Sequence, residues 1–247
     1  MKKTVIVIPA RYGSSRLNGK PLLEVCSKPI IQWVWEKAIQ IKDVDDVIIA
    51  TDNNLIFEAC KAFKANVEMT KTSHKSGSDR IAEVISRRDD FEYIINLQGD
   101  EPLINPKAIE LLINSVKNND KADISTLVRP IENISEYENP NVVKCVLNKY
   151  NYAMYFSRAT IPYFRNKNND IPIYAHIGLY GYKRKSLLNL TGLPQANCEI
   201  AESLEQLRAL YNGMNIKVEL FNEVSIGIDT QEDFDNFKNL MESKINN

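Results

Sequence analysis

The sequence predicts an α/β fold in which helices cover a mostly parallel, doubly wound sheet. Three observations support this. Short apolar segments typical of buried strands recur through the first half, the stretches between them repeat apolar residues at helical spacing, and residues after 122 become rich in Val, Ile, Tyr and Phe. The strands of the first half are expected at residues 4–8, 47–50, 67–70 and 93–97.

Helices are expected between these strands. Pro29 suits the first position of a helix, because proline lacks the N–H that would otherwise stay unpaired there. The apolar positions at helical spacing are Ile31, Val34, Trp35, Ala38 and Ile41; Leu55, Ala59, Ala62 and Phe63; Ile81, Val84 and Ile85; Ile109, Leu112, Ile113 and Val116. In such sheets ligands bind beyond the carboxyl ends of the strands, which is where the functional residues are expected.

The second half has a more antiparallel pattern. Residues 148–151 join two strand-like segments and predict a hairpin, and the polar stretch 165–170 is expected to form a mobile loop. The whole chain, 1–247, is expected to be one domain, with 123–182 as an antiparallel subdomain. Further strands are expected at 123–128, 142–147, 152–156, 175–182 and 216–221, and further helices at 199–211 and 231–243.

The composition excludes several classes of protein. The 247 residues include 31 Lys and Arg and 32 Asp and Glu, so the formal net charge of −1 gives no general attraction to nucleic acid or an anionic membrane. No apolar run is long enough to span a membrane, and no signal peptide is expected. The four cysteines form no CxxC pair, which predicts free thiols and a cytoplasmic protein. The two histidines are far apart, so any metal should be a hard cation held by carboxylates.

The loop after the first strand, PARYGSSRLNGKPL, has the composition of an anion-binding loop. Small residues allow a ligand to approach the backbone, and cations favour an anion. The loop matches neither GxxxxGK[ST] nor GxGxxG, so a P-loop and an NAD-dependent oxidoreductase are poor fits. The residues concerned are Gly13, Ser14, Ser15 and Gly19, with Arg11, Arg16 and Lys20.

Two acidic residues at distant strand ends complete the pattern. Asp100 follows an apolar strand in NLQGDEP, and Asp229 lies in IGIDTQED. A helix N-cap at Thr230, with Asp233 three residues later, explains the threonine but not Asp229. Mg²⁺ prefers one or two carboxylates together with phosphate oxygens, so Asp100 and Asp229 are candidate metal ligands for a nucleoside triphosphate.

A family resemblance then becomes specific. The chain contains, in order, IPARYGSSRLNGKPL, VIIATDN, MTKTSHKSGSDRIAEV, NLQGDEPLI, NPNVVKCVL, YAMYFSRATIPYFR, HIGLYGYKRKSL, LEQLRALYNG and GIDTQEDF. It resembles the 3-deoxy-manno-octulosonate cytidylyltransferases (CMP-Kdo synthetases) over roughly residues 5–237. The resemblance implies a fold of the nucleotide-diphospho-sugar transferase type with an antiparallel dimerisation subdomain. It also implies a Mg²⁺-dependent cytoplasmic homodimer that uses CTP and the acidic eight-carbon sugar Kdo in lipopolysaccharide biosynthesis.

The resemblance also implies roles for individual residues. Arg11, Lys20, Asp100 and Asp229 would be catalytic, and the two aspartates would bind the metal. The CTP site would comprise Ala10, Arg11, Ser14, Lys20, Thr51, Asp52, Ser76, Gly77, Arg80, Gln98 and Gly99. The sugar site would comprise Arg16, Arg158, His176, Tyr180, Tyr182, Glu205 and Gln206. Purely structural roles are also open: the tyrosines and His176 could pack within a sheet, Glu205 could lie on a solvated helix face, and Ser14 could belong to a turn.

The sequence departs from the family pattern near the expected sugar site. Cys198, Ile200 and Ala201 interrupt the usual approach to LEQLR, whereas Glu202 and Glu205 are kept and are expected to share a helix face. Two acids there could meet an ammonium, so 8-amino-Kdo is a second candidate substrate. A nine-carbon sialic-type acid is a third, and a non-catalytic nucleotide-binding protein is the rival interpretation of the whole chain. Asn18 and Gln231 stand where the family commonly has proline, and both changes fit loop adjustment.

Overall fold

The computed structural model describes residues 2–13, 17–166, 171–223 and 227–245. The chain forms two compact units. The first comprises residues 1–110 and 225–247, and the second comprises residues 111–224. The expected antiparallel subdomain, 123–182, therefore lies within a second unit that extends beyond it in both directions.

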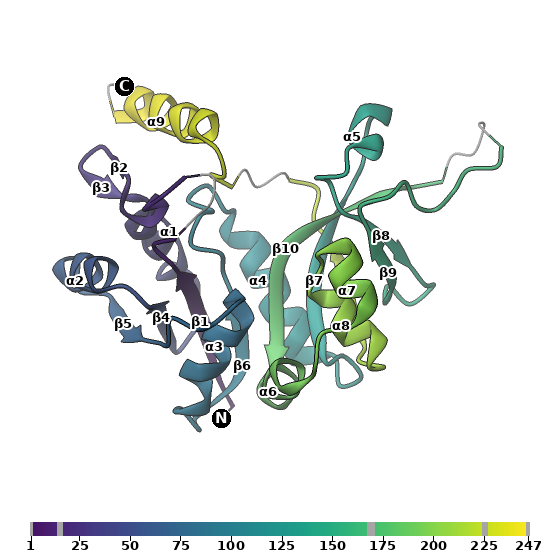
Figure 1. Cartoon of the computed structure of the whole chain (residues 1–247), viewed down its shortest axis with the longest axis horizontal. Helices are drawn as coiled ribbons and strands as arrows, with labels where there is room; N and C mark the ends of the chain where they lie inside the picture. The colour runs from purple at the N-terminus through teal and green to yellow at the C-terminus, as the bar shows by residue number, and fades with distance from the viewer. Residues whose placement is uncertain (1, 14–16, 167–170, 224–226, 246–247) are drawn as a thin grey trace. The chain divides into compact units, whose positions relative to one another are not determined.

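The first unit contains a parallel sheet in the order β6-β1-β4-β5, as Figure 1 shows. Its central strand β1 pairs with β4 on one side and β6 on the other, with Val7 opposite Ile48 and Asn96. Four successive β1 residues, Val5 to Ile8, are fully buried, as expected for a strand covered on both faces. The strands are β1 (Lys3–Ala10), β4 (Asp46–Thr51), β5 (Asn66–Met69) and β6 (Phe91–Asn96).

The helices of this unit alternate with the strands as predicted. The chain moves outward from β1 through β4 to β5 and then returns to β6 on the other side of β1. Right-handed crossovers therefore place α1 and α2 on one face of the sheet and α3 on the other, which is the doubly wound arrangement. Pro29 is the N-cap of α1 and not its first residue, so the helix begins one residue later than predicted. The helices are α1 (Ile30–Ala38), α2 (Asn54–Ala62), α3 (Gly77–Ser86) and α9 (Gln231–Ile245), with a 3₁₀ turn η1 (Lys20–Leu22) and a small hairpin of β2 (Glu24–Val25) and β3 (Lys28–Pro29).

The second unit is built mainly on antiparallel pairing. Strand β7 pairs antiparallel with β10 and parallel with β11. The predicted hairpin at residues 148–151 is confirmed, because β8 and β9 pair antiparallel around it, and β8 also pairs with β10. The strands are β7 (Ile124–Pro130), β8 (Lys144–Leu147), β9 (Ala153–Ser157), β10 (Tyr174–Lys183) and β11 (Ile216–Leu220).

The continuous helix predicted at 199–211 is wrong. Helix α7 (Asn197–Glu202) ends at Ser203, whose φ of 52° is left-handed, and α8 (Gln206–Tyr211) begins after the break. A left-handed residue cannot continue a right-handed helix, so Glu202 and Glu205 do not share one helix face. The other helices are α4 (Pro106–Asn118), which crosses the boundary between the units, α5 (Ile134–Glu138) and α6 (Arg184–Gly192).

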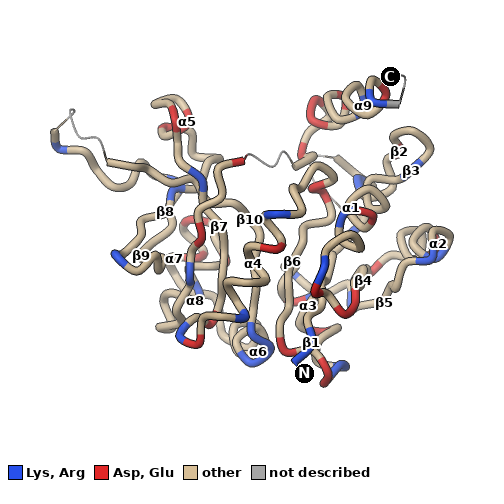
Figure 2. The backbone as a smooth tube through the Cα atoms, turned by 180° about the vertical axis from the view of Figure 1, so that it is seen from behind, with Lys and Arg blue, Asp and Glu red and all other residues tan. Residues whose placement is uncertain are grey.

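The charge distribution agrees with the near-neutral composition. Figure 2 shows acidic and basic residues interspersed along both units. In the part of the chain that the structure describes, no helix is long and apolar enough to cross a membrane. Of the loop expected at 165–170, residues 167–170 lie outside the described residues.

Candidate active site

The loop after β1 turns back on itself before η1. Gly19 adopts a left-handed φ of 67°, and its N–H donates to the Tyr12 carbonyl at 3.0 Å. Glycine suits this position because a side chain would strain the backbone there. Arg11 is exposed beside the loop. The expected ligand-binding residues Ser14 and Arg16 lie outside the described residues.

Lys20 joins the two candidate metal ligands. Its ammonium lies 2.6 Å from Asp100 Oδ2 and 3.2 Å from Asp229 Oδ1. It also donates to the Ile228 carbonyl at 2.6 Å. Lys20 is 9% exposed, so a largely buried charge is compensated by two carboxylates. The sequence placed Lys20 near phosphates, and the structure places it between Asp100 and Asp229.

Backbone contacts bring these two strand-end acids together, although they are 129 positions apart in the sequence. The N–H of Ile228 donates to the Asp100 carbonyl at 2.8 Å, which fixes Asp229 beside Asp100. Gly99 allows the chain to approach β1 closely, because a Cβ there would lie 2.9 Å from the Pro9 carbonyl oxygen. The predicted N-cap is present, since the Asp233 N–H donates to Thr230 Oγ1 at 3.2 Å.

The donor set at Asp100 and Asp229 fits a hard divalent cation. Both carboxylates reach one cationic group, the Lys20 ammonium, which shows that they converge on a common point. Among the described residues, no group of three or more His, Cys, Asp or Glu side chains could hold a metal ion. Two carboxylates suit Mg²⁺, which completes its shell with water and phosphate oxygens.

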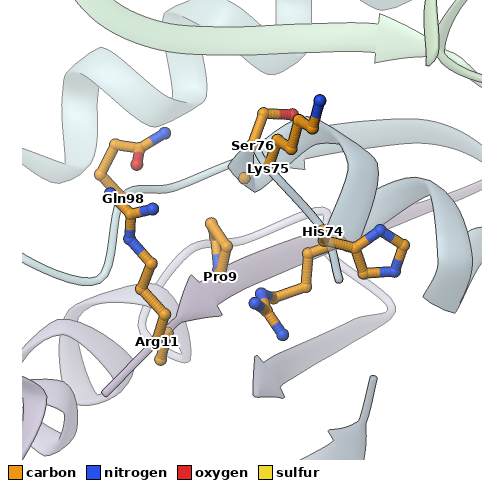
Figure 3. Close-up of a pocket in the computed structure, with 9 residues that line it drawn as sticks. Pro9, Arg11, His74, Lys75, Ser76 and Gln98 are labelled. Atoms are coloured by element: carbon orange, nitrogen blue, oxygen red, sulfur yellow. The ribbon is translucent and has the colours of Figure 1, made fainter. Parts of the chain in front are cut away.

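A pocket lies between the end of β1 and the start of α3 (Figure 3). In this view Pro9 separates Arg11 from His74, and the imidazole ring of His74 points away from Pro9. The pocket brings together six of the predicted ligand residues. Its lining comprises Pro9, Ala10, Arg11, His74, Lys75, Ser76, Gly77, Arg80 and Gln98.

Ser76 begins α3 with a capping box. Its hydroxyl accepts from the Asp79 N–H at 3.1 Å, while the Asp79 carboxylate accepts from the Ser76 N–H at 3.3 Å. The first turn of the helix is thereby fixed beside the pocket. Helix N-termini favour anions, so this end is suited to a phosphate-bearing or otherwise electron-rich ligand.

Arg80 and Asp52, both predicted to bind the nucleotide, form an ion pair with each other. Arg80 is 3% exposed, and its guanidinium donates to Asp52 Oδ2 at 2.7 Å and to the Thr70 hydroxyl. Thr51, at the end of β4, is fully buried, and its carbonyl accepts from the Thr70 N–H at 2.8 Å. Arg80 therefore both lines the pocket and connects α3 to the ends of β4 and β5.

Sequence reasoning missed Glu83 and His74. The Glu83 carboxylate accepts from the Lys71 N–H at 2.9 Å and contacts the His74 ring and the Arg87 guanidinium. Burial raises the pKa of Glu83, but these donors and cations outweigh it and lower the pKa. Glu83 thus holds the segment before α3 in place. Glu83 lies three residues after SHKSGSDR and within the longer motif MTKTSHKSGSDRIAEV, which was the available signal.

Three of the predicted sugar residues lie together on β10, in the second unit. The His176 and Tyr180 rings are 5.3 Å apart, and the Tyr180 and Tyr182 rings are 5.9 Å apart. A bulge between Ile177 and Tyr180 interrupts the pairing with β7, as is common near functional sites. Burial raises the pKa of Tyr180, and so does the nearby Glu205 charge, which places the predicted Glu205 in the same group.

His176 is neutral and has a defined tautomer. Burial lowers its pKa to about 3. The Thr126 hydroxyl donates to the Leu179 carbonyl at 2.8 Å, so its 2.9 Å contact with His176 Nε2 must be one in which the ring donates. This leaves His176 Nδ1 as the acceptor nitrogen.

The remaining sugar candidates in the described part of the chain are Gln206 and Arg158. Gln206 is 6% exposed at the start of α8. The Arg158 guanidinium donates to the carbonyls of Glu202 and Pro140, at 2.8 and 3.0 Å. Sequence reasoning missed Lys144, which is fully buried and donates to three carbonyls, those of Asn139, Val142 and Arg158.

Glu202 is committed to contacts within the protein. One carboxylate oxygen accepts from the Ser157 hydroxyl at 2.5 Å, and the other accepts from the Arg158 N–H at 2.9 Å. Both oxygens thus connect α7 to the end of β9. The expectation that Glu202 and Glu205 share one helix face is wrong, and each Glu202 oxygen already accepts a hydrogen bond from the protein.

The family model for cytidylyltransferases matches residues 5–216 of this chain. The chain belongs to the cytidylyltransferase family. This match spans most of β1, the loop after it, the pocket, Asp100 and the β10 residues, and it ends before Asp229.

Individual relatives agree with this assignment. A 3-deoxy-manno-octulosonate cytidylyltransferase of Thermodesulfovibrio yellowstonii is 46% identical, with 94% of this chain and 95% of the relative covered. One of Escherichia coli is 42% identical, with 99% and 98% covered.

Solved structures place this cytidylyltransferase in the same fold. The structure of CMP:2-keto-3-deoxy-manno-octonic acid synthetase complexed with CTP matches with a TM-score of 0.94 and 42% identity, covering 98% of this chain and all of that one. A 4-diphosphocytidyl-2C-methyl-D-erythritol synthase from Anaerococcus prevotii matches with a TM-score of 0.63 at 15% identity, covering 98% and 96% of the two chains, and it supports the fold alone. The predicted α/β nucleotidyltransferase fold is confirmed.

Proposed function

We infer that the protein transfers CMP from CTP to the anomeric hydroxyl of Kdo, giving CMP-Kdo and pyrophosphate. The observation that carries this inference is the convergence of Lys20, Asp100 and Asp229 beside the pocket, in a chain whose relatives over almost its full length are named for this reaction. Convergent carboxylates with a buried cation suit a metal-bound triphosphate. A non-catalytic nucleotide-binding protein of this fold would be expected to lack a metal carboxylate or a phosphate cation, and here Asp100, Asp229 and Lys20 are all present.

The chemistry requires positioning and charge stabilisation. The sugar hydroxyl forms a bond to the α-phosphorus of CTP while the bond to the pyrophosphate leaving group breaks. Lys20 and Arg11 are the cations of the first unit that would offset charge on the phosphates, and Asp100 and Asp229 would hold Mg²⁺. The metal, when bound, would screen phosphate charge and lower the pKa of the attacking hydroxyl.

The sugar would be recognised mainly by polar groups of the second unit, with Arg16 as the exception. His176 Nδ1 can accept a hydrogen bond from a sugar hydroxyl, because Nε2 carries the proton toward Thr126. Tyr180, Tyr182 and Glu205 would add further donors and acceptors. Arg16 and Arg158 remain the candidates for the sugar carboxylate. Such a set discriminates between sugars, since an unpaired buried polar group costs about 1–3 kcal/mol.

We further propose a Mg²⁺-dependent cytoplasmic homodimer that supplies activated Kdo for lipopolysaccharide. CTP is an intracellular nucleotide, which supports the cytoplasmic location. Exposed apolar side chains on and beside β9, including Met154 at 61% and Tyr163 at 85%, support a surface covered by a second copy. Analytical ultracentrifugation of the purified protein tests the dimer.

A substrate panel tests the proposed reaction. Pyrophosphate release is measured with CTP, UTP, ATP and GTP, each with Kdo, 8-amino-Kdo and a sialic acid. We expect CTP with Kdo to give the largest kcat/KM. Equal turnover of UTP and CTP would contradict the nucleotide assignment. A tenfold preference for 8-amino-Kdo would change the sugar and leave the transfer chemistry intact.

A further inference from the structure

The Lys20 ammonium has all of its hydrogen-bonding capacity committed to the candidate metal site. An ammonium has three N–H donors, and Lys20 directs them at Asp100 Oδ2, Asp229 Oδ1 and the Ile228 carbonyl. The side chain is 11% exposed, whereas those of Asp100 and Asp229 are 30% and 48% exposed. Lys20 thus approaches the two carboxylates from the protein side, and their other faces remain accessible to solvent.

A divalent cation needs the same carboxylates. Mg²⁺ binds oxygens at about 2.0–2.1 Å and demands near-ideal geometry, and the ammonium already contacts one oxygen of each carboxylate, so the two cations compete for Asp100 and Asp229. Two adjacent cations would also repel each other strongly in a partly buried site. Two carboxylates and one ammonium carry a formal charge of −1, and a dication would change this to +1. The charges therefore oppose binding of the metal alone.

A nucleoside triphosphate that binds together with the metal offsets this charge repulsion. Its phosphates bring several negative charges and provide an alternative partner for the ammonium. The lysine side chain is flexible enough to make this exchange, since it is a point charge on a four-carbon stem. It begins η1, directly after the left-handed Gly19, and so lies within the loop expected to contact phosphates.

We propose that Lys20 makes the site selective for a metal–nucleotide complex over the free metal ion. The ammonium holds Asp100 and Asp229 together and competes with a divalent cation for them. When the metal arrives with a triphosphate, the ammonium transfers from the carboxylates to the phosphates. This inference rests on the proposed function and names the form in which the nucleotide is bound.

Binding of Mn²⁺ alone, followed by electron paramagnetic resonance, tests the proposal without turnover. The full-length wild-type protein is compared with Lys20→Met, which keeps much of the side chain's apolar bulk and removes the charge. We expect Lys20→Met to bind Mn²⁺ at least tenfold more tightly than the wild type in the absence of nucleotide, because no ammonium then competes for the two carboxylates. Lys20→Gln, a second neutral variant, should behave in the same way and serves if Lys20→Met does not fold.

Two controls identify the site. Lys28→Met removes a lysine of the same unit that forms an ion pair with Glu36 at 2.8 Å. This change should leave Mn²⁺ binding unchanged. Adding Asp100→Asn to Lys20→Met should abolish the tighter binding. Addition of CTP should raise the Mn²⁺ affinity of the wild type far more than that of Lys20→Met, because metal and nucleotide are coupled through Lys20.

Unchanged or weaker Mn²⁺ binding by both neutral variants would overturn the proposal. Tighter binding that persists with Asp100→Asn would also overturn it, because the metal would then occupy another site. Either result leaves the proposed function standing if the wild-type protein still forms CMP-Kdo. The reaction itself fails only if that product is absent.

Discussion

At the scale of single residues, the two strand-end aspartates are notable because both contact the largely buried Lys20 ammonium. Asp100→Asn and Asp229→Asn should each reduce kcat about a hundredfold or more, since each removes a charge from a hard-cation site. Circular dichroism should show folded proteins, because both side chains lie at a solvent-accessible edge. Asp235→Asn, an exposed change on α9, is the matched control. Near-normal activity of Asp229→Asn at low Mg²⁺ would contradict the two-carboxylate site.

His176 gives a pH dependence with a defined sign. Burial lowers its pKa to about 3, against an ordinary value of 6.5 in the unfolded chain. Between these values the unfolded chain binds a proton that the folded protein does not, so stability falls as the pH is lowered through this range. One such group contributes at most about 1.4 kcal/mol per pH unit.

The measurement is urea unfolding from pH 7 to pH 4 for the wild type and for His176→Gln, which keeps an N–H donor for Thr126. The stability of the wild type should decline more steeply with falling pH than that of the variant. Parallel curves for the two proteins would mean that His176 titrates normally in the folded state.

At the scale of secondary-structure elements, α3 shapes the pocket through its first turn and through the Glu83 side chain. Its first turn is fixed by the Ser76–Asp79 capping box, and its Glu83 side chain holds the preceding segment through Lys71 and His74. Glu83→Gln weakens charge-assisted contacts to this segment. We expect the KM for CTP to rise about fivefold to tenfold, with kcat within about twofold, because the residue positions the pocket without touching the reacting atoms.

Glu58→Gln is the matched control for this change, because Glu58 is exposed on α2 of the same unit. Its kinetic constants should equal those of the wild type. A fall in kcat with an unchanged KM for Glu83→Gln would argue against a positioning role.

The elements also show where sequence reasoning succeeds and fails. The strands of the first unit were predictable because buried parallel strands are short, continuous apolar runs between helical patterns. The break at Ser203 was not, because apolar spacing continues across it and serine carries no strong signal for a left-handed conformation. That break also explains why the paired role of Glu202 and Glu205 could not be judged from spacing alone.

The sequence predicted which residues belong to the candidate site better than it predicted how they contact one another. Motifs identified Lys20, Asp100 and Asp229, but only the tertiary structure shows that the lysine lies between the carboxylates. Local sequence likewise gives no sign that Arg80 is paired with Asp52, because the two belong to different elements. Long-range pairing of charges depends on the packing of strands and helices, which periodicity does not encode.

At the scale of the whole molecule, the candidate residues divide between the two units. Those expected to bind CTP belong to residues 1–110 and 225–247, and most of those expected to bind Kdo belong to 111–224. A ligand that binds only the folded state suppresses the opening of the segments it contacts, so each substrate should leave its own pattern of amide protection.

Hydrogen–deuterium exchange with one substrate at a time measures this division. CTP with Mg²⁺ should protect segments of the first unit around residues 10–20, 74–80 and 98–101. Kdo alone should protect β10 and the start of α8 in the second unit. CMP is the control for CTP, because it lacks the two outer phosphates. Glucose is the control for Kdo, because it is a sugar without a carboxylate. Protection by CTP confined to residues 111–224 would contradict the assignment of the nucleotide to the first unit, because Lys20, Asp100 and Asp229 would then lie outside its footprint.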